Sequence, residues 1–409
     1  MSERYERHVE AARNVHSRWL LRTAPTCPAS TWHIGAMASR MTRGLDWAEV
    51  ERAMAAQAFM ERAADRAAAV REQRLQRLQR RRQILRKARF ALQELSAAGE
   101  DPPEIRLRRG FIRRAEPRQR TEDPDRLPQR AAQHPGKLAD AVQADLRSRP
   151  PMTRLVSRSR WAMPLYLTAI FEAHCALGAD HKLDHRERYL AAGPAGAWTD
   201  PWSTLLGDPD RTQRNRRVRV TRALTELERH GLVELGKPGT MNRFEQFKLL
   251  SEVGNGRAYE VPGETGPALT LPPQFYLSGW HLVLEPREIA VWLMLRELES
   301  RYSARGVGAT DQTRWGYYGV TGEVYTAHYE LAEFGLVELL DLIPNRRRGR
   351  ATRKPQHPRA QAGQVSQAAE DRPRLPVYRF ITHPEAFDRD ALEVVSRALS
   401  ASPPPRFNT

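Results

Sequence analysis

The side chains best suited to chemistry lie between Asp208 and Leu235, in the stretch DPDRTQRNRRVRVTRALTELERHGLVEL. At a helical spacing of about 100° per residue, its large apolar side chains fall on one stripe and most of its polar ones on the opposite face. The opposite face holds Arg211, Arg214, Asn215, Val218, Thr221, Arg222 and Thr225. Guanidinium, amide and hydroxyl groups can bind phosphates and purine edges, and a small apolar side chain can contact a thymine methyl group. This face therefore predicts contacts to the major groove of double-stranded DNA.

A helix followed by a short strand is needed to position these side chains. Asp208-Pro209 is typical of a helix N-cap and first position, and Gly231 is typical of a helix end. The predicted buried stripe consists of Val220, Ala223, Leu224 and Leu227. Beyond the glycine, residues 232–235 predict a strand and residues 237–239 a turn. The alternative is an ordinary surface helix whose arginines are only solvated.

The same pattern occurs a second time in the chain. TELERHGLVEL (Thr225 to Leu235) and YELAEFGLVEL (Tyr329 to Leu339) share the residues at seven positions, and Ala223 also matches Ala327. Two copies of one supersecondary unit are indicated. Chance similarity between two helix–glycine–strand junctions is the alternative, because such junctions share propensities.

The segment LTELERHGLVEL resembles the recognition helix and wing of a winged helix-turn-helix domain. Two such domains in tandem resemble the initiators of plasmid replication, which bind repeated origin sites with both domains, and also bacterial transcriptional regulators. The resemblance covers residues 150–385 and is an analogy at the level of the fold. It implies that Lys237 and Arg243 lie near the minor groove or the DNA backbone.

In the second copy we expect Thr321 to cap the third helix, with Tyr325 and Thr326 on its outward face. This face is aromatic where that of the first copy is basic. Tyrosines can hold phosphates or stack on bases, but they also form protein interfaces. The first copy is therefore expected to be the better DNA reader.

We expect a mainly α fold with small β wings, in which a helical N-terminal region precedes two winged-helix domains. The expected parts are a helical region with a long basic helix (1–100), a basic proline-rich linker (101–149), winged-helix domains at 150–263 and 264–385, and a C-terminal helix and tail (386–409). The second domain contains a predicted disordered wing loop (344–374). Its residues Arg346, Arg347, Arg348 and Arg350 are predicted to follow the DNA backbone.

The long N-terminal helix has leucines every seven residues, at Leu78, Leu85 and Leu92. Arg82 and Arg89 stand where a second apolar seam position is expected, which weakens a coiled-coil interpretation. Its arginine cluster could touch nucleic acid. The preferred interpretation is a solvated helix that caps the globular part or pairs with a second copy.

The composition favours a polyanionic partner. The 409 residues carry a formal net charge of +17 and a pI of about 10.4, so nucleic acid is expected first and an anionic membrane surface second. Cys27 and Cys175 lie far apart, which argues against a disulfide framework and fits a reducing cytoplasm. As a DNA-binding protein, the chain is expected to be cytoplasmic and nucleoid-associated. The N-terminus lacks the apolar region of a secretory signal, and the apolar stretch Ile289–Leu295 is too short to span a bilayer.

No catalytic, cofactor or small-molecule site is predicted, because phosphate-loop, nucleophile-elbow and zinc-protease motifs are missing. His174, Cys175, His181 and His185 are zinc-ligand types, but their spacing is not that of a known finger, so no metal is expected. A non-enzymatic, DNA-binding protein is the expectation, in plasmid or mobile-element replication initiation or, alternatively, in transcriptional regulation. Homodimerisation through the N-terminal helix or the second copy is also considered. The rival from another class is a protein-interaction scaffold with incidental charge, which would not show a steep salt dependence.

Overall fold

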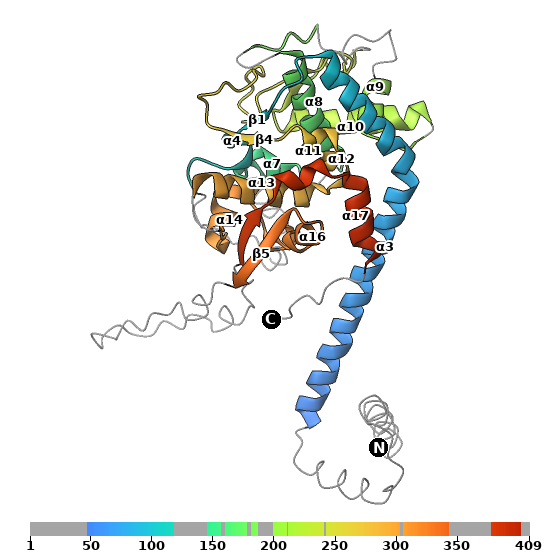
Figure 1. Cartoon of the computed structure of the whole chain (residues 1–409), viewed down its shortest axis with the longest axis vertical. Helices are drawn as coiled ribbons and strands as arrows, with labels where there is room; N and C mark the ends of the chain where they lie inside the picture. The colour runs from blue at the N-terminus through green and yellow to red at the C-terminus, as the bar shows by residue number, and fades with distance from the viewer. Residues whose placement is uncertain are drawn as a thin grey trace, which may run out of the picture. The chain divides into compact units, whose positions relative to one another are not determined.

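The computed structural model describes residues 47–117, 145–156, 160–177, 181–186, 199–210, 212–240, 243–302, 306–342 and 378–401. The chain divides into two compact units, residues 1–70 and 71–409. Within the first unit, the described residues form the beginning of helix α3 (Trp47–Ala98). Helices dominate, and the described strands pair as three two-stranded sheets (Figure 1). The prediction of a mainly α fold with small sheets is thus confirmed.

From Arg71 onward, α3 packs against the globular part of the second unit through a stripe of buried residues. The stripe has alternating spacings of four and three: Arg74, Leu78, Arg81, Leu85, Ala88, Leu92 and Leu95. Arg82, by contrast, is exposed. The heptad of leucines is therefore real, but its second seam position is one residue earlier than predicted. This buried stripe packs against the globular part of the same chain, so residues 71–98 of α3 cap the globular part.

Residues 101–117 are not a linker, contrary to the sequence prediction. Strand β1 (Ile105–Arg108) pairs antiparallel with β4 (Ala268–Leu271). Helix α4 (Arg109–Ile112) follows, and the apolar side chains of both elements are fully buried: Ile105, Leu107, Phe111 and Ile112. The linker was predicted from the composition of the segment, which is dominated by prolines and charged residues, so these four apolar residues did not alter the prediction. Residues 118–144 of the predicted linker lie outside the described residues.

The first copy consists of three helices and an antiparallel strand pair. The helices are α8 (Ala162–Ala176), α9 (Thr199–Leu205) and α10 (Gln213–Arg229). Strand β2 (Val233–Glu234) pairs with β3 (Lys248–Leu249). Between the first two helices, Lys182 forms an isolated antiparallel bridge with Glu260, beyond the strand pair. Helix α7 (Pro151–Arg154) precedes this copy.

The second copy has the same order of elements. Helices α13 (Pro286–Arg301) and α14 (Asp311–Tyr318) are followed by the short helices α15 (Gly322–Tyr325) and α16 (His328–Glu333). Strand β5 (Val337–Leu342) pairs with β6 (Tyr378–Thr382). Val307, between the first two helices, bridges to Phe380 of β6. Each copy thus has one residue between its first two helices that forms an isolated bridge, to Glu260 beyond β3 in the first copy and to β6 in the second.

The two copies share one helix–glycine–strand junction in backbone detail. Gly231 and Gly335 both have a φ of 69°, in the left-handed region that glycine adopts at low cost. The N–H of the next residue, Leu232 or Leu336, donates to the carbonyl oxygen five residues earlier (3.0 and 2.9 Å). The repeat seen in the sequence is therefore also a repeat of structure.

Both copies and α3 from Arg71 onward share one hydrophobic core. Helix α12 (Trp280–Val283) contacts α8 of the first copy and α17 (Ala391–Ser400). The rings of Trp280 and Trp292 pack on Phe387, in the short 3-10 helix η4 (Pro384–Asp388) that follows β6. Helix α11 (Gln274–Leu277) adds Phe275 to this aromatic cluster. The boundaries predicted at 263/264 and 385/386 therefore do not separate compact units.

Candidate nucleic-acid interface

Helix α10 presents a basic, solvent-exposed face. It carries six arginines and two glutamates, and five of the arginines lie in its first ten residues. Arg214, Arg217 and Arg222 are exposed, and their side chains have no hydrogen-bond or ion-pair partner in the part of the chain that the structure describes. Val218 is 37% exposed among them. Arg214 and Arg222 are thus exposed where the helical spacing predicted, and Arg217, at the edge of the face, was missed.

The start of α10 differs from the prediction. The helix begins at Gln213, after the N-cap Thr212, and not at Asp208. The Asp208 carboxylate accepts a hydrogen bond from the Asp210 N–H (3.0 Å), and that of Asp210 accepts one from the Thr212 N–H (2.9 Å). Aspartate readily binds the N–H two residues ahead, which here forms a turn instead of a helix cap. Arg219 of α10 forms ion pairs with both aspartates and so fixes this turn to the helix.

The other predicted residues of this helix are partly occupied by local contacts. The Asn215 amide donates to the Asp210 carboxylate (3.0 Å), although the residue is exposed. The Thr221 hydroxyl donates to the Val218 carbonyl oxygen (3.1 Å). Arg211 lies outside the described residues. The exposed arginines are therefore the strongest donors that this face offers.

Arg243 and Lys237, the two basic residues predicted to contact DNA from the hairpin after α10, differ in their environments. The Gly236 N–H donates to the Arg243 carbonyl oxygen (2.8 Å), which closes the hairpin beyond β2. The Arg243 guanidinium forms an ion pair with Glu228 of α10 (2.7 Å). Arg243 thus braces the hairpin against the helix, and its position near the minor groove or the DNA backbone stays a prediction. Lys237 is exposed and has no side-chain partner within the described residues, so it remains available at the hairpin loop.

In the second copy, Tyr325 is not on an outward face. It is only 1% exposed, packs edge-on against Phe380 and lies under the guanidinium of Arg314, 4.7 Å from its ring centroid. The prediction failed because the third helix is broken after Tyr325 into α15 and α16, which changes which side chains point outward.

The other two predicted residues of this copy have structural roles. Thr321 caps α15, as predicted, by accepting a hydrogen bond from the Val324 N–H (3.4 Å). The half-buried Thr326 donates its hydroxyl hydrogen bond to the Glu323 carbonyl oxygen (2.6 Å). Helices α15 and α16 contain no lysine or arginine, while glutamate occurs in both. Their chemistry is therefore unsuited to DNA phosphates.

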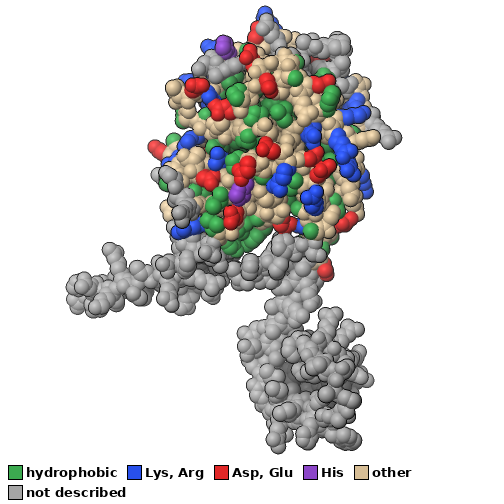
Figure 2. Space-filling model, viewed as in Figure 1, with side chains coloured by type: hydrophobic (Ala, Val, Ile, Leu, Met, Phe, Trp, Pro, Cys, Tyr) green, Lys and Arg blue, Asp and Glu red, His purple; other side chains and the backbone are tan. Residues whose placement is uncertain are grey.

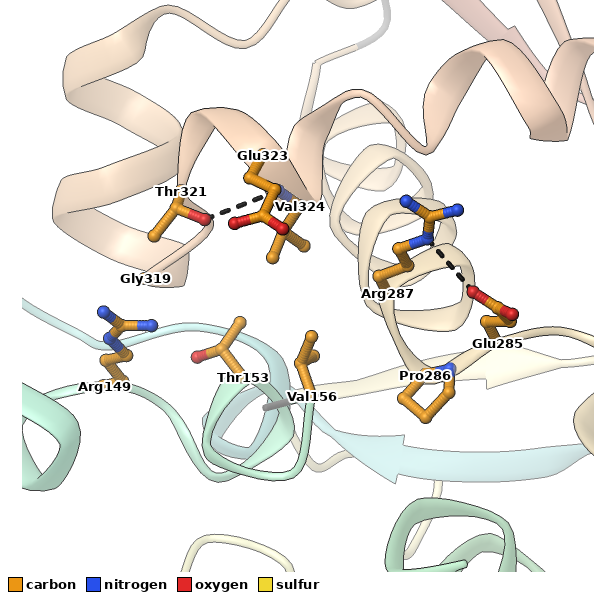
Figure 3. A pocket seen from close by; sticks show the side chains of 10 residues that line it. All are labelled: Arg149, Thr153, Val156, Glu285, Pro286, Arg287, Gly319, Thr321, Glu323 and Val324. Atoms are coloured by element: carbon orange, nitrogen blue, oxygen red, sulfur yellow. Dashed lines mark hydrogen bonds and ion pairs between the residues drawn. The ribbon is translucent and has the colours of Figure 1, made fainter. Parts of the chain in front are cut away.

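The beginning of α15 faces the chain that leads into the first copy across a hollow. A hollow of about 460 Å³ separates Thr321, Glu323 and Val324 from Arg149, Thr153 and Val156 (Figure 3). A Cβ on Gly319 would come within 2.9 Å of the Thr153 hydroxyl oxygen, so the two sides touch closely at this edge. The arginines of the hollow are paired: Arg149 with Asp145 (2.6 Å) and Arg287 with Glu285 (3.2 Å). We conclude that the arginines beside the start of α15 are already paired, so this face suits DNA phosphates less well than the exposed face of α10.

The histidines considered for metal binding serve as hydrogen-bonding residues. His174 is buried, its Nε2 accepts from the Arg106 N–H (3.1 Å), and its Nδ1 donates to the Ile170 carbonyl oxygen (2.9 Å). Burial lowers the pKa of His174 to about 4, so the ring is neutral. His185 Nδ1 accepts from the Leu249 N–H (3.2 Å). Among the residues that the structure describes, no group of three or more side chains is placed to hold a metal ion.

The arginines of the second wing that were predicted to contact the DNA backbone lie outside the described residues, as does the loop 344–374 that contains them. They are Arg346, Arg347, Arg348 and Arg350. In the described part of the chain, none of the helices is long and apolar enough to cross a bilayer.

Comparison with protein-family models, curated proteins and solved structures finds no match to this chain. The geometry around α10 therefore carries the functional argument.

Proposed function

We propose that this chain binds double-stranded DNA sequence-specifically, with α10 in the major groove and the β2–β3 hairpin beside it. The observation that carries the proposal is the exposed face of α10, where Arg214, Arg217 and Arg222 point to solvent without partners in the described structure. A guanidinium is a planar, permanently charged donor that can bind guanine edges or phosphates in a bidentate manner. The proposal involves no catalytic step, no cofactor and no small molecule.

The order of elements around α10 supports the proposal. Three helices precede an antiparallel strand pair, and Lys182, between the first two helices, forms an isolated antiparallel bridge beyond that pair. This is the order found in winged helix-turn-helix domains, which the sequence of α10 and β2 resembles. Such a likeness is an analogy at the level of the fold, so the function still depends on the side chains of α10.

Replication initiation at repeated sites of a plasmid or mobile element is the process that we propose first, with transcriptional regulation as the alternative. Both processes need the same contacts to DNA. They differ in where the bound sites lie, because an initiator binds repeats beside a replication origin and a regulator binds beside a promoter. Either role implies a protein associated with the nucleoid in the cytoplasm.

The test is binding of the full chain to DNA from its own genomic neighbourhood, with random DNA as competitor. We expect a protected site that survives the competitor. Arg214→Ala and Arg222→Ala should each weaken specific binding by about 1–3 kcal/mol, because each removes a strong donor from the reading face. Arg397→Ala, an exposed arginine on α17, is the matched control and should leave binding unchanged.

Two outcomes would contradict the proposal. Unchanged binding by both α10 variants would exclude α10 as the reading helix. Binding without any preferred site that disappears at modest salt would show that net charge alone makes the contact. The interaction scaffold would then be the better description of the chain.

A further inference from the structure

Helix α3 divides its basic residues between two faces. The buried or half-buried ones are bound within the chain: Arg71 to Glu333, Arg74 to Glu288 and Arg81 to Leu206 and Gly207. Of the exposed ones, Arg80, Arg82 and Lys87 have no side-chain partner among the described residues. Phe90, on the same exposed half of the helix, is 61% exposed.

This exposed half lacks the acidic residues that normally balance a solvated helix. Between Glu72 and Glu94 the sequence contains no aspartate or glutamate. Surface helices usually interleave the two signs, and like charges four residues apart, such as Arg82 and Arg86, destabilise a helix. Arg86 has one acidic neighbour, Glu393 of α17, at 3.9 Å in an exposed pair. A bound polyanion would relieve this repulsion.

The buried stripe of α3 contacts the turn that leads into α10. Arg81 of α3 donates to the Gly207 carbonyl oxygen (3.1 and 3.0 Å), and Arg219 of α10 pairs with the next residue, Asp208. The two helices are thus tied to adjacent residues of one turn. At about 100° per residue, Arg219 lies on the flank of α10 that borders its exposed face. Figure 2 shows Lys and Arg side chains gathered on the right-hand side of the molecule, where Figure 1 shows α3 and α10.

We propose that the exposed half of α3, at Arg80, Arg82 and Lys87, binds the phosphate backbone of the same duplex that α10 reads. This inference rests on the proposed function and adds a sequence-independent contact to it. The axial distance from Arg80 to Lys87 is about 10 Å, over which a duplex presents about six phosphate charges. At about 100° per residue, Arg80 and Lys87 lie at one edge of the exposed half and Arg82 at the other, so the three cations can reach phosphates on both sides of the helix.

The test compares two triple variants of the full chain that remove the same charge. One is Arg80→Ala, Arg82→Ala and Lys87→Ala. The control is Arg257→Ala, Arg379→Ala and Arg397→Ala, three exposed arginines on other elements that lack side-chain partners within the described chain. Affinity for the specific duplex and for random DNA is measured over a salt series, and unfolding midpoints confirm that all proteins are folded.

We expect the α3 variant to weaken specific and random binding equally. The slope of log affinity against log salt should fall by about 0.9 for each phosphate that the variant no longer neutralises, or by up to about 2.7 for three phosphates. The control should keep the wild-type slope. A charge-conserving variant, Arg80→Lys with Arg82→Lys, should also keep it, because lysine still neutralises a phosphate.

Other outcomes separate the inference from the proposed function. If the α3 variant and the control behave alike while Arg222→Ala loses specific binding, the inference is wrong and the proposed function stands. If the wild-type chain binds no DNA, both are wrong. If the α3 variant binds DNA normally but loses binding to vesicles of anionic phospholipid, the surface serves a membrane and the inference is overturned.

Discussion

The ion pair between Arg74 and Glu288 shows how a strongly basic helix is held against an apolar core. The guanidinium and carboxylate are 2.8 Å apart, and their side chains are 6% and 0% exposed. Burial raises the pKa of the Glu288 carboxyl, and Arg74 opposes this effect. Glu288 also accepts a hydrogen bond from the Glu285 N–H (2.7 Å) at the start of α13. One residue pair thus fixes both α3 and the first turn of α13.

Breaking this pair from one side should destabilise the protein strongly. Arg74→Met leaves a buried carboxylate without its cation, which should cost about 3–5 kcal/mol of unfolding free energy. Adding Glu288→Gln removes the charge but keeps an acceptor for the Glu285 N–H, so the double variant should lose less than the sum of the single ones. Denaturant unfolding measures this, with the exposed Arg80→Met as control. Additive losses would mean that the pair is not coupled.

The buried His174 should make stability depend on pH. Its pKa is lowered from 6.5 to about 4 by burial, so below pH 6.5 the unfolded chain takes up a proton that the folded chain does not. The contribution of His174 to the free energy of unfolding is fully present above pH 6.5. It is lost as the pH falls toward 4, by up to about 3 kcal/mol. His174→Gln should flatten the unfolding free energy between pH 6.5 and 4. An unchanged pH profile would contradict the assignment.

Among the elements, β1 and α4 are the part of the fold that the sequence concealed. If residues 101–117 were a linker, their side chains would contribute nothing to stability. Because Phe111 is fully buried, Phe111→Ala should instead cost about 3–5 kcal/mol in denaturant unfolding. Glu116→Ala, an exposed change in the same segment, should have no effect. Equal unfolding midpoints for the two variants would restore the linker interpretation.

Local periodicity explains which elements and site residues could be predicted. The third helix of the first copy, its glycine stop and its exposed Arg214 and Arg222 follow from spacing within one segment. Strand β1 was missed because only four residues alternate and their partner strand lies far along the chain. Tyr325 was misplaced for the same reason, since Phe380, against which it packs, belongs to another element. The ion pair of Arg243 with Glu228 of α10 could not be predicted from local spacing either.

At the scale of the whole second unit, two structurally similar copies carry different surfaces. The first exposes a basic helix, whereas the third helix of the second is acidic and broken, and a hollow lies between its start and residues 149–156. Helix α3 is joined to both copies, through Arg74 to α13 and through Arg81 to the turn before α10. The repeat thus provides one copy suited to binding and one that supports it.

Under the proposed function, the second copy adds no basic reading helix, because α15 and α16 contain no lysine or arginine. A single recognition helix contacts only a few base pairs, and so short a word recurs by chance many times in any genome. A chain that reads DNA with α10 alone would find its target through the number and spacing of adjacent words. Such a chain would bind clusters of short sites well and an isolated copy of the same short sequence poorly.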